Sequence, residues 1–507
     1  MRRNGKIKEL GELANELSAL RGNKRVVHCH GVFDLLHVGH IRHFQEAKKF
    51  GDVLVVTLTA DNFVNKGPNR PAFTEELRAE AIAALDCVDY VAINKHPMAM
   101  EAINLIRPDF YVKGSDYKDS GKDHTGGIVL EESAVKAAGG QLVFTDDITF
   151  SSSNLINRHM PTFPREVTEY LAEFSAKYKM EDVLKYVDGV RPLKVLVVGE
   201  TIIDEYQYCE AIGKSSKEPM LAVRRLSTEK FAGGVLAVAN NVASFCSSVG
   251  LLTFLGTEDS QEEFIRQSLS GNIKKILLHQ EDAPTLVKRR FVEKYFFTKL
   301  LEVYEMNPGV LSEADNEMLC ATLSEHVPRY DVVIVVDFGH GMLNKEAIDI
   351  LCGKARFLAV NAQSNAGNMG YHAISRYPRA DYICIAEGEA RLEARNRHGS
   401  LKEIVLDVTR RLDSKRMVVT RGKYGCLCYG EDEGFFEIPA LASQVVDRMG
   451  AGDSFLSLTA PCVAQGAPMD LVGFIGNAVG AQAVATVGHR RSIERAPLLK
   501  HIETLLK

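Results

Sequence analysis

Two histidines three residues apart are the first residues in the chain that can do chemistry. They lie in Gly31-Val-Phe-Asp-Leu-Leu-His-Val-Gly-His40, between the apolar pair Val26-Val27 and a stretch with helical spacing. This order predicts a strand, a tight turn and a helix, with His37 and His40 on one face of the helix start. The N–H groups at a helix start are unpaired and favour a phosphate. The motif therefore predicts a site that holds a nucleoside triphosphate while charge moves onto departing pyrophosphate.

Three later loops carry groups that can bind phosphate beside these histidines. They contain Lys66, then Lys113, Gly114 and Asp116, and then Ser152, Ser153 and Arg158. A lysine in a loop after a strand can neutralise phosphate oxygens, and a serine run before a helix offers hydroxyl and N–H donors. Each loop alone is more typical of a solvated loop or cap, but together they indicate one site.

A second constellation lies near the end of the chain, in Asp447-Arg-Met-Gly-Ala-Gly-Asp-Ser-Phe455. The small residues Gly450, Ala451 and Gly452 let the backbone approach a phosphate and point N–H groups at it from a helix start. Asp453 can then accept the proton of an attacking hydroxyl, as carboxylates do in phosphoryl transfer. This pattern predicts a kinase-type site.

Other residues of this half can complete that site. They are Thr420, Gly422 and Gly425 in a strand-end turn suited to nucleotide phosphate, Asp204 at the expected end of the first strand, and Gly233-Gly234 before a helix that begins near Leu236. A carboxylate at a strand end can bind sugar hydroxyls, so Asp204 is a candidate for the acceptor side.

Alternating apolar and helical stretches must position these residues. The first half predicts strands at 26–27, 53–58, 88–93, 110–112 and 141–144 and helices at 6–20, 41–50, 74–85, 98–106 and 129–138, and the second half predicts strands at 195–199, 332–337, 357–360, 382–385 and 417–420. Such alternation is typical of parallel sheets with helices on both faces, which bind ligands at the carboxyl ends of their strands. We expect an α/β domain over 1–160, a helical linker over 161–190 and a second, different α/β domain over 191–507.

Composition excludes some classes of function. The 507 residues are 46% hydrophobic and 25% charged, with a net charge of −5, so the chain has no general attraction for nucleic acid or anionic membrane. No apolar run approaches the ~20 residues of a membrane span. The ten cysteines are scattered, which predicts reduced thiols in a cytoplasmic protein. We therefore expect no nucleic-acid partner and no membrane insertion.

The first set of motifs resembles the HxGH nucleotidyltransferases. Residues 6–159 are more narrowly similar to the nucleotidyltransferase domain of the bifunctional heptose-phosphate kinase/ADP-heptose synthases, including Lys113-Gly-Ser-Asp-Tyr117 and Ser151-Ser-Ser-Asn-Leu-Ile156. The resemblance implies a Rossmann-like domain in which His37, His40 and Lys66 act on the triphosphate. It implies nucleotide contacts by Gly31, Phe33, Asp34, Gly39, Lys113, Asp116, Ser152, Ser153 and Arg158. The implied reaction joins a sugar 1-phosphate to ATP or CTP with Mg²⁺ and releases pyrophosphate.

Residues 195–500 resemble the ribokinase/PfkB sugar kinases. The resemblance implies an α/β/α domain with a small β-lid from segments near 205–226 and 285–304, which closes over a sugar or sugar phosphate. It assigns the base to Asp453, the anion hole to Gly450–Gly452, the ATP loop to Thr420, Gly422 and Gly425, the sugar contacts to Asp204, Gly233 and Gly234, and a metal contact to Glu389. ATP and Mg²⁺ are the implied cofactors. An exposed β-lid is a common dimer surface in this family, so a homodimer is one option and the oligomeric state stays open.

Four positions depart from the kinase pattern. They are Ala237 for a sugar-binding asparagine, Ala386 in the metal motif that keeps Glu389, Asn361 in place of an aspartate, and Met449 for a phosphate-facing threonine. The transferase half has a longer insertion between Asp116 and Gly139, and transferase precedes kinase, the reverse of the heptose enzymes.

Two hypotheses follow. The chain is a bifunctional enzyme that phosphorylates a sugar or a heptose 7-phosphate-like sugar phosphate and then makes a nucleotide sugar. Alternatively, it is a cytidylyltransferase acting on a polyol phosphate, with the kinase-like domain as a sugar-binding or regulatory module.

Overall fold

The chain forms two compact units. A computed structural model describes residues 5–64, 66, 70–114, 127–145, 163–307, 309 and 311–507. One unit comprises Met1–Leu171 with Ala496–Lys507, and the other comprises Ala172–Arg495. Within the described residues, no helix is both long and apolar enough to cross a membrane.

The first unit is built on a five-stranded parallel sheet in the order β3-β2-β1-β4-β5. Its elements are α1 (Leu10–Leu20), β1 (Val26–Gly31), α2 (Val38–Lys48), β2 (Val53–Thr59), α3 (Glu75–Ala83), β3 (Tyr90–Asn94), α4 (Met100–Ile106), β4 (Phe110–Gly114), α5 (Gly127–Ala137) and β5 (Gln141–Thr145). The strand–helix alternation and parallel sheet expected from the sequence are confirmed.

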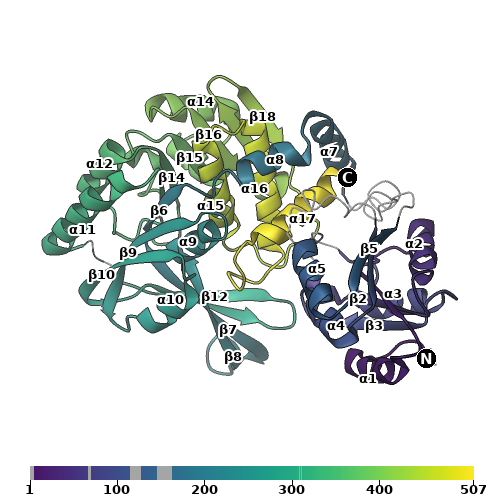
Figure 1. Cartoon of the computed structure of the whole chain (residues 1–507). Coiled ribbons are helices and arrows are strands. Elements are labelled where there is room, and N and C mark those ends of the chain that lie inside the picture. The colour runs from purple at the N-terminus through teal and green to yellow at the C-terminus, as the bar shows by residue number, and fades with distance from the viewer. Residues whose placement is uncertain are drawn as a thin grey trace. The chain divides into compact units, whose positions relative to one another are not determined.

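Alternate residues of the central strands face opposite layers of helices. Val27 and Leu54 belong to the core cluster that contains Phe44 of α2, whereas Val26 and Val53 belong to the cluster with α1. A strand buried on both faces needs helices on both, because successive side chains point to opposite sides. Helices therefore cover both faces of this sheet (Figure 1).

The second unit has a nine-stranded sheet in the order β10-β9-β6-β13-β14-β15-β16-β17-β18, parallel as far as β16 and antiparallel after it. Its strands are β6 (Lys194–Gly199), β9 (Ser248–Glu258), β10 (Ile273–Pro284), β13 (Val332–Asp337), β14 (Leu358–Ala362), β15 (Tyr382–Ala386), β16 (Arg416–Thr420), β17 (Cys426–Gly430) and β18 (Gly434–Ile438). The described helices around them are α8 (Met180–Val187), α9 (Val235–Ala243), α10 (Glu262–Ser268), α11 (Glu313–His326), α12 (Lys345–Lys354), α13 (Glu387–Glu393), α14 (Leu401–Arg411), α15 (Ala451–Ala464) and α16 (Met469–Val484). The helix α17 (Arg495–Leu506) belongs to the first unit from Ala496 onward.

A separate four-stranded sheet forms the expected β-lid. Its strands are β7 (Thr201–Lys214), β8 (Leu221–Gly234), β11 (Val287–Glu293) and β12 (Thr298–Glu305), in the order β12-β11-β7-β8. The hairpins β7–β8 and β11–β12 are antiparallel, and β7 pairs with β11 in parallel. These strands cover the two segments from which the sequence predicts a lid.

The stretch between the α/β regions is helical, with α7 (Arg165–Lys177) followed by α8. Its end packs against α16 of the second unit. Phe174 stacks on Phe474 with ring centroids 4.0 Å apart, and the Tyr178 hydroxyl donates a 2.8 Å hydrogen bond to Asp470. These contacts make the end of α7 part of the second unit.

Candidate active sites

His37 and His40 stack on each other at the start of α2. Their ring centroids are 3.9 Å apart and the ring planes meet at 22°. His37 caps the helix, because its Nδ1 accepts a 3.1 Å hydrogen bond from the Gly39 N–H. The neutral His37 ring therefore carries its proton on Nε2. In the neutral form, two imidazoles and the helix start form a polar cluster suited to a phosphate.

Burial keeps both imidazoles neutral near pH 7. It lowers the pKa of His37, and it lowers the pKa of His40 to about 3, with His37 and Lys66 adding to the effect. The Lys66 ammonium is thus close enough to act on the His40 imidazole through space. Burial also lowers the pKa of Lys66 to about 8. A triphosphate is the kind of ligand that would restore the charge of these groups.

The remaining residues of the opening motif shape this site. The Phe33 ring packs on His40 at 5.2 Å, and a Cβ on Gly31 would lie 2.9 Å from that ring, so glycine is needed there. Asp34 is buried and accepts hydrogen bonds from the Ala72 N–H and the Arg70 guanidinium. Its carboxylate thereby holds Arg70 and Ala72 in place.

Lys113 lies at the end of β4, next to β1. Its ammonium is 2.9 Å from the Glu131 carboxylate and lies over the Tyr111 ring. Glu131 is not predictable from the sequence as a partner of Lys113, because no spacing rule links a strand end to a helix that follows an insertion. Four expected site residues lie outside the described residues: Asp116, Ser152, Ser153 and Arg158.

In the second unit, a cavity of about 640 Å³ lies between the lid, the strand ends of the large sheet and the start of α15. It is lined by most residues that the sequence assigns to a kinase site: Asp204, Gly234, Glu389, Thr420, Gly450, Ala451, Gly452 and Asp453. Gly233, Gly422 and Gly425 are not among the lining residues. At Gly425 a Cβ would lie 1.9 Å from the Ile438 carbonyl oxygen, so close backbone packing explains that glycine.

Asp453 is buried in the first turn of α15, and Gln363 from the loop after β14 holds its carboxylate. The Gln363 Nε2 donates a 2.6 Å hydrogen bond to Asp453 Oδ1. Burial raises the pKa of Asp453 above its usual value. A carboxylate with a raised pKa at a helix start, in a cavity, is the arrangement expected of a general base.

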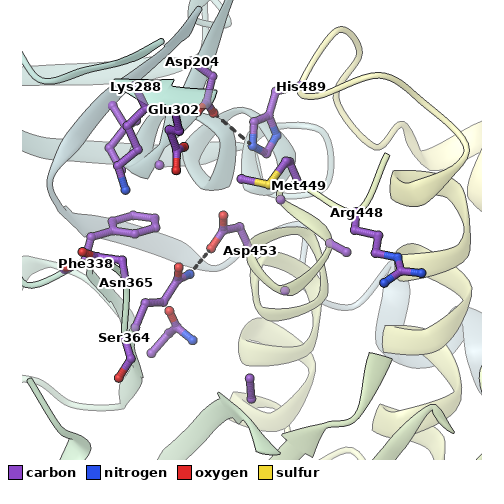
Figure 2. Close-up of a pocket in the computed structure, with 18 of the residues that line it drawn as sticks. Asp204, Lys288, Glu302, Phe338, Ser364, Asn365, Arg448, Met449, Asp453 and His489 are labelled. Carbon is purple, nitrogen blue, oxygen red and sulfur yellow. Dashed lines mark hydrogen bonds and ion pairs between the residues drawn. The ribbon is translucent and has the colours of Figure 1, made fainter. Parts of the chain in front are cut away.

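The glycine turn before Asp453 is shaped by His489. Gly450 has φ +72°, and a Cβ there would lie 1.9 Å from the His489 ring. The His489 Nε2 is 3.9 Å from Asp204 Oδ2, so the imidazole lies close to both the turn and the acceptor side of the cavity (Figure 2).

The lid supplies charged side chains to the acceptor side. Asp204 lies on β7 and not at the end of the first strand as predicted, because β6 ends at Gly199 and the apolar pair Ile202-Ile203 continues into the lid. The Arg290 guanidinium bonds Asp204 and also contacts the Glu302 carboxylate at 2.6 Å. This ion pair fixes Asp204 in the cavity wall.

Lys288 is a second buried cation of this wall, beside Arg290. Its side chain is 6% exposed, and its ammonium lies over the rings of Tyr304 and Phe338 at 4.9 and 5.5 Å. Within the described part of the chain the ammonium has no hydrogen-bond or ion-pair partner, and it reaches toward the cavity in Figure 2. Burial lowers its pKa. The carboxylates of Asp204, Glu302 and Glu200 act on the ammonium through space and oppose this effect of burial on the pKa. Because none of them pairs with it directly, the ammonium can still bind an anionic ligand in the cavity.

The expected metal contact, Glu389, is held by the backbone. Its carboxylate accepts hydrogen bonds from the Ser364 and Ala386 N–H groups at 3.0 and 2.7 Å, and burial raises its pKa to about 7. Asn361 lines the cavity nearby and donates to the Cys384 carbonyl, while its buried Oδ1 has no hydrogen-bond partner in the described residues. Among those residues no cluster of three or more metal-ligating side chains occurs.

Sequence reasoning did not find several residues that line or support this cavity: Lys288, Arg290, Lys299, Glu302, Gln363 and His489. All six lie outside the glycine motifs, four on the lid strands β11 and β12 and two in loops. The one available signal is the charged run Lys288-Arg-Arg290 between the apolar residues Val287 and Phe291.

Two family models match the chain. Residues 28–158 match the Cytidylyltransferase-like family, and residues 351–496 match the pfkB family carbohydrate kinases. The transferase match precedes the kinase match, in the order expected from the sequence.

Curated relatives match the transferase-like region. The chain is 40% identical over 141 residues to the bifunctional protein HldE of Syntrophotalea carbinolica, covering 27% of each chain. It is 38% identical over 168 residues to the bifunctional protein HldE of Geobacter metallireducens, covering 32% of each. The matched stretch thus spans about a third or less of these relatives.

Among solved structures, Escherichia coli phosphofructokinase-2 in complex with potassium aligns with a TM-score of 0.50 and 14% identity, over 62% of this chain and 99% of that one. The likeness shows a ribokinase-like fold.

Proposed function

We propose that this chain is a bifunctional enzyme of sugar-nucleotide synthesis. The second unit transfers the γ-phosphoryl group of ATP to a sugar or sugar phosphate, and the first unit joins a sugar 1-phosphate to ATP or CTP. The observation that carries the proposal is that each α/β unit has a helix-start phosphate site beside the group its reaction needs: His37 and His40 in one, Asp453 in the other. The similarity to proteins named HldE supports a heptose-type sugar.

In the kinase reaction, Asp453 accepts the proton of the acceptor hydroxyl as its oxygen attacks the γ-phosphorus, and ADP leaves. Gln363 holds the carboxylate in place, and the N–H groups of the turn at Gly450–Gly452 stabilise the transferred group. The unpaired Lys288 favours an acceptor that carries a phosphate over a neutral sugar.

In the transferase reaction, a phosphate oxygen of the sugar 1-phosphate attacks the α-phosphorus in line, and pyrophosphate leaves. His37 and His40 donate hydrogen bonds to the α-phosphate or balance its charge, and Lys66 neutralises the triphosphate. No covalent enzyme intermediate is needed, since positioning and charge stabilisation carry the reaction. Asp116, Ser152, Ser153 and Arg158 belong to this proposal as nucleotide contacts.

Mg²⁺ fits the kinase cavity as an ion held mainly by substrate phosphates. Magnesium is commonly bound by one or two carboxylates together with phosphate oxygens. The Glu389 carboxylate and the Asn361 side-chain carbonyl oxygen would therefore be enough protein ligands. When bound, the ion neutralises charge on the phosphates.

The test incubates the protein with each nucleoside triphosphate, Mg²⁺ and a panel of sugars and sugar phosphates, and measures pyrophosphate and ADP release separately. We expect Asp453→Asn to abolish sugar-dependent ADP release and to leave pyrophosphate release from a supplied sugar 1-phosphate intact. If the wild-type protein releases pyrophosphate but never sugar-dependent ADP, the chain is instead a nucleotidyltransferase with a sugar-binding module.

The lid is the proposed homodimer surface. Its strands carry exposed apolar side chains, among them Ile212, Leu221, Leu226, Leu301 and Val303. Large exposed apolar surfaces mark interaction sites. Light scattering should give twice the chain mass for wild type and the chain mass for Leu301→Lys.

A further inference from the structure

A buried carboxylate, Asp447, joins the lid to the turn that holds Gly450. Its side chain is 1% exposed. Its Oδ1 accepts from the Lys299 ammonium at 2.6 Å and from the Met449 N–H at 3.2 Å. Its Oδ2 accepts from the Tyr206 hydroxyl at 2.6 Å and from the Gly488 N–H at 3.0 Å.

The four donors come from three parts of the fold. Tyr206 lies on β7 and Lys299 on β12, both strands of the lid. Met449 belongs to the turn that precedes Gly450, and Gly488 precedes the histidine that packs on that turn. One carboxylate therefore fixes the lid, the glycine turn and the His489 loop together.

Charge makes Lys299 the decisive donor. A buried carboxylate is costly unless a cation pairs with it, and the other three donors are neutral. Although burial opposes it, the bonds from Lys299 and Tyr206 hold the pKa of Asp447 below its usual value. The Lys299 side chain is 32% exposed, so solvent ions reach this position when the ammonium is removed. The same strand also walls the cavity through Leu300, Leu301 and Glu302.

We propose that Lys299 is a positioning residue that acts as a tethered cation. Its ion pair with Asp447 links the position of β12, which lies over the acceptor, to the conformation of the glycine turn. That turn binds the transferred phosphoryl group. The inference rests on the proposed kinase reaction for its catalytic consequence, but the ion pair itself can be tested without catalysis.

The experiment compares Lys299→Ala with the matched control Lys294→Ala, in the full-length protein. Lys294 is an exposed lysine of the same hairpin, and its side chain forms no ion pair with any described residue. Melting curves and ADP release are measured in chloride salts of potassium, ammonium, sodium and tetramethylammonium at equal ionic strength. We expect wild type and Lys294→Ala to be indifferent to the cation.

Lys299→Ala should melt earlier and lose about 10²-fold in kcat with a smaller change in the KM for ATP, as expected when an oxyanion-binding turn is displaced. Ammonium or potassium should restore part of both losses, because a small cation can occupy the vacated place beside Asp447, whereas tetramethylammonium should not. Lys299→Arg should keep most of the activity, and Lys299→Ala should add little to Asp447→Asn.

The outcomes separate the two proposals. Cation-independent melting of Lys299→Ala at the wild-type temperature would overturn the tethered-cation role. Earlier melting with unchanged kcat would reduce the pair to a structural contact and also overturn it. If wild type phosphorylates no acceptor while Lys299→Ala shows cation-dependent melting, the kinase proposal fails and the ion pair stands.

Discussion

The two glycines of Gly450-Ala-Gly452 should respond in opposite ways to the same substitution. At Gly450, φ is +72° and an added Cβ would lie 1.9 Å from the His489 ring. The left-handed backbone costs alanine about 1–2 kcal/mol, and forcing the imidazole aside costs about 1–3 kcal/mol more. We expect Gly450→Ala to lose about 2–5 kcal/mol of the free energy of unfolding of the second unit, together with kinase activity.

Gly452 is the matched control, because it lies in the same turn and an added Cβ meets no atom within 4 Å. Gly452→Ala should melt at the wild-type temperature or higher, since alanine favours a helix by up to about 1 kcal/mol. It should still lose about 10²-fold in ADP release, because its methyl group stands where the backbone must approach phosphate. Stability and activity therefore separate at this glycine.

Scanning calorimetry of the full-length variants, with ADP and pyrophosphate assays on the same samples, measures both effects. Adding His489→Ala to Gly450→Ala should recover the part of the loss that comes from the clash and leave the backbone part. Equal melting of Gly450→Ala and wild type, or equal destabilisation by both alanines, would refute this account of the turn. Pyrophosphate release should be unchanged throughout.

Three further outcomes follow from the charges in the two sites. Gln363→Glu places a second carboxylate against Asp453, whose pKa is already raised by burial. The like charge should raise that pKa further, so the acid limb of the pH profile for ADP release should move to higher pH by about one unit or more. An acid limb that does not move would contradict the assignment of Asp453 as the base. His40→Ala should lower the rate of pyrophosphate release by about 10²–10³-fold and leave ADP release intact; loss of both activities would point to misfolding. Because the pKa of Lys66 is about 8, kcat/KM for the triphosphate should fall as the pH rises through 8, when the ammonium loses its charge. In Lys66→Arg the guanidinium keeps its charge, so kcat/KM should stay constant from pH 7 to 9.

Short-range patterns predict the chemistry at helix starts in this protein. His37 and His40 lie where a strand, a turn and a helix follow each other, and Asp453 lies just after the glycine turn that begins α15, so local spacing is enough to place them. The β-lid was also predictable, but only as segments near 205–226 and 285–304. Its parallel pairing of β7 with β11 joins residues about 80 positions apart, and no periodicity records that partner.

Long-range pairing is why the acceptor side was missed. Lys288 faces the cavity because it lies opposite Asp204 across the parallel strands. Asp204 itself was placed on the wrong strand, because an apolar run that continues through a glycine looks like one strand in sequence and is two in the structure. Gln363 reaches Asp453 across 90 positions from a loop with no regular pattern.

The departures from the kinase pattern therefore need to be judged by what replaces the missing groups. Asn361 leaves an unpaired carbonyl oxygen in the cavity wall, two residues before the glutamine that holds the proposed base. Ala237 removes a polar group from α9, but the lid supplies Asp204 and Lys288 to the same cavity. An inactive relic has no reason to keep a buried lysine whose ammonium has no direct hydrogen-bond or ion-pair partner in the described residues, because replacing it with an apolar residue would relieve its desolvation cost. These replacements favour an altered acceptor over a lost reaction, and they make the acceptor panel the decisive measurement for the kinase unit.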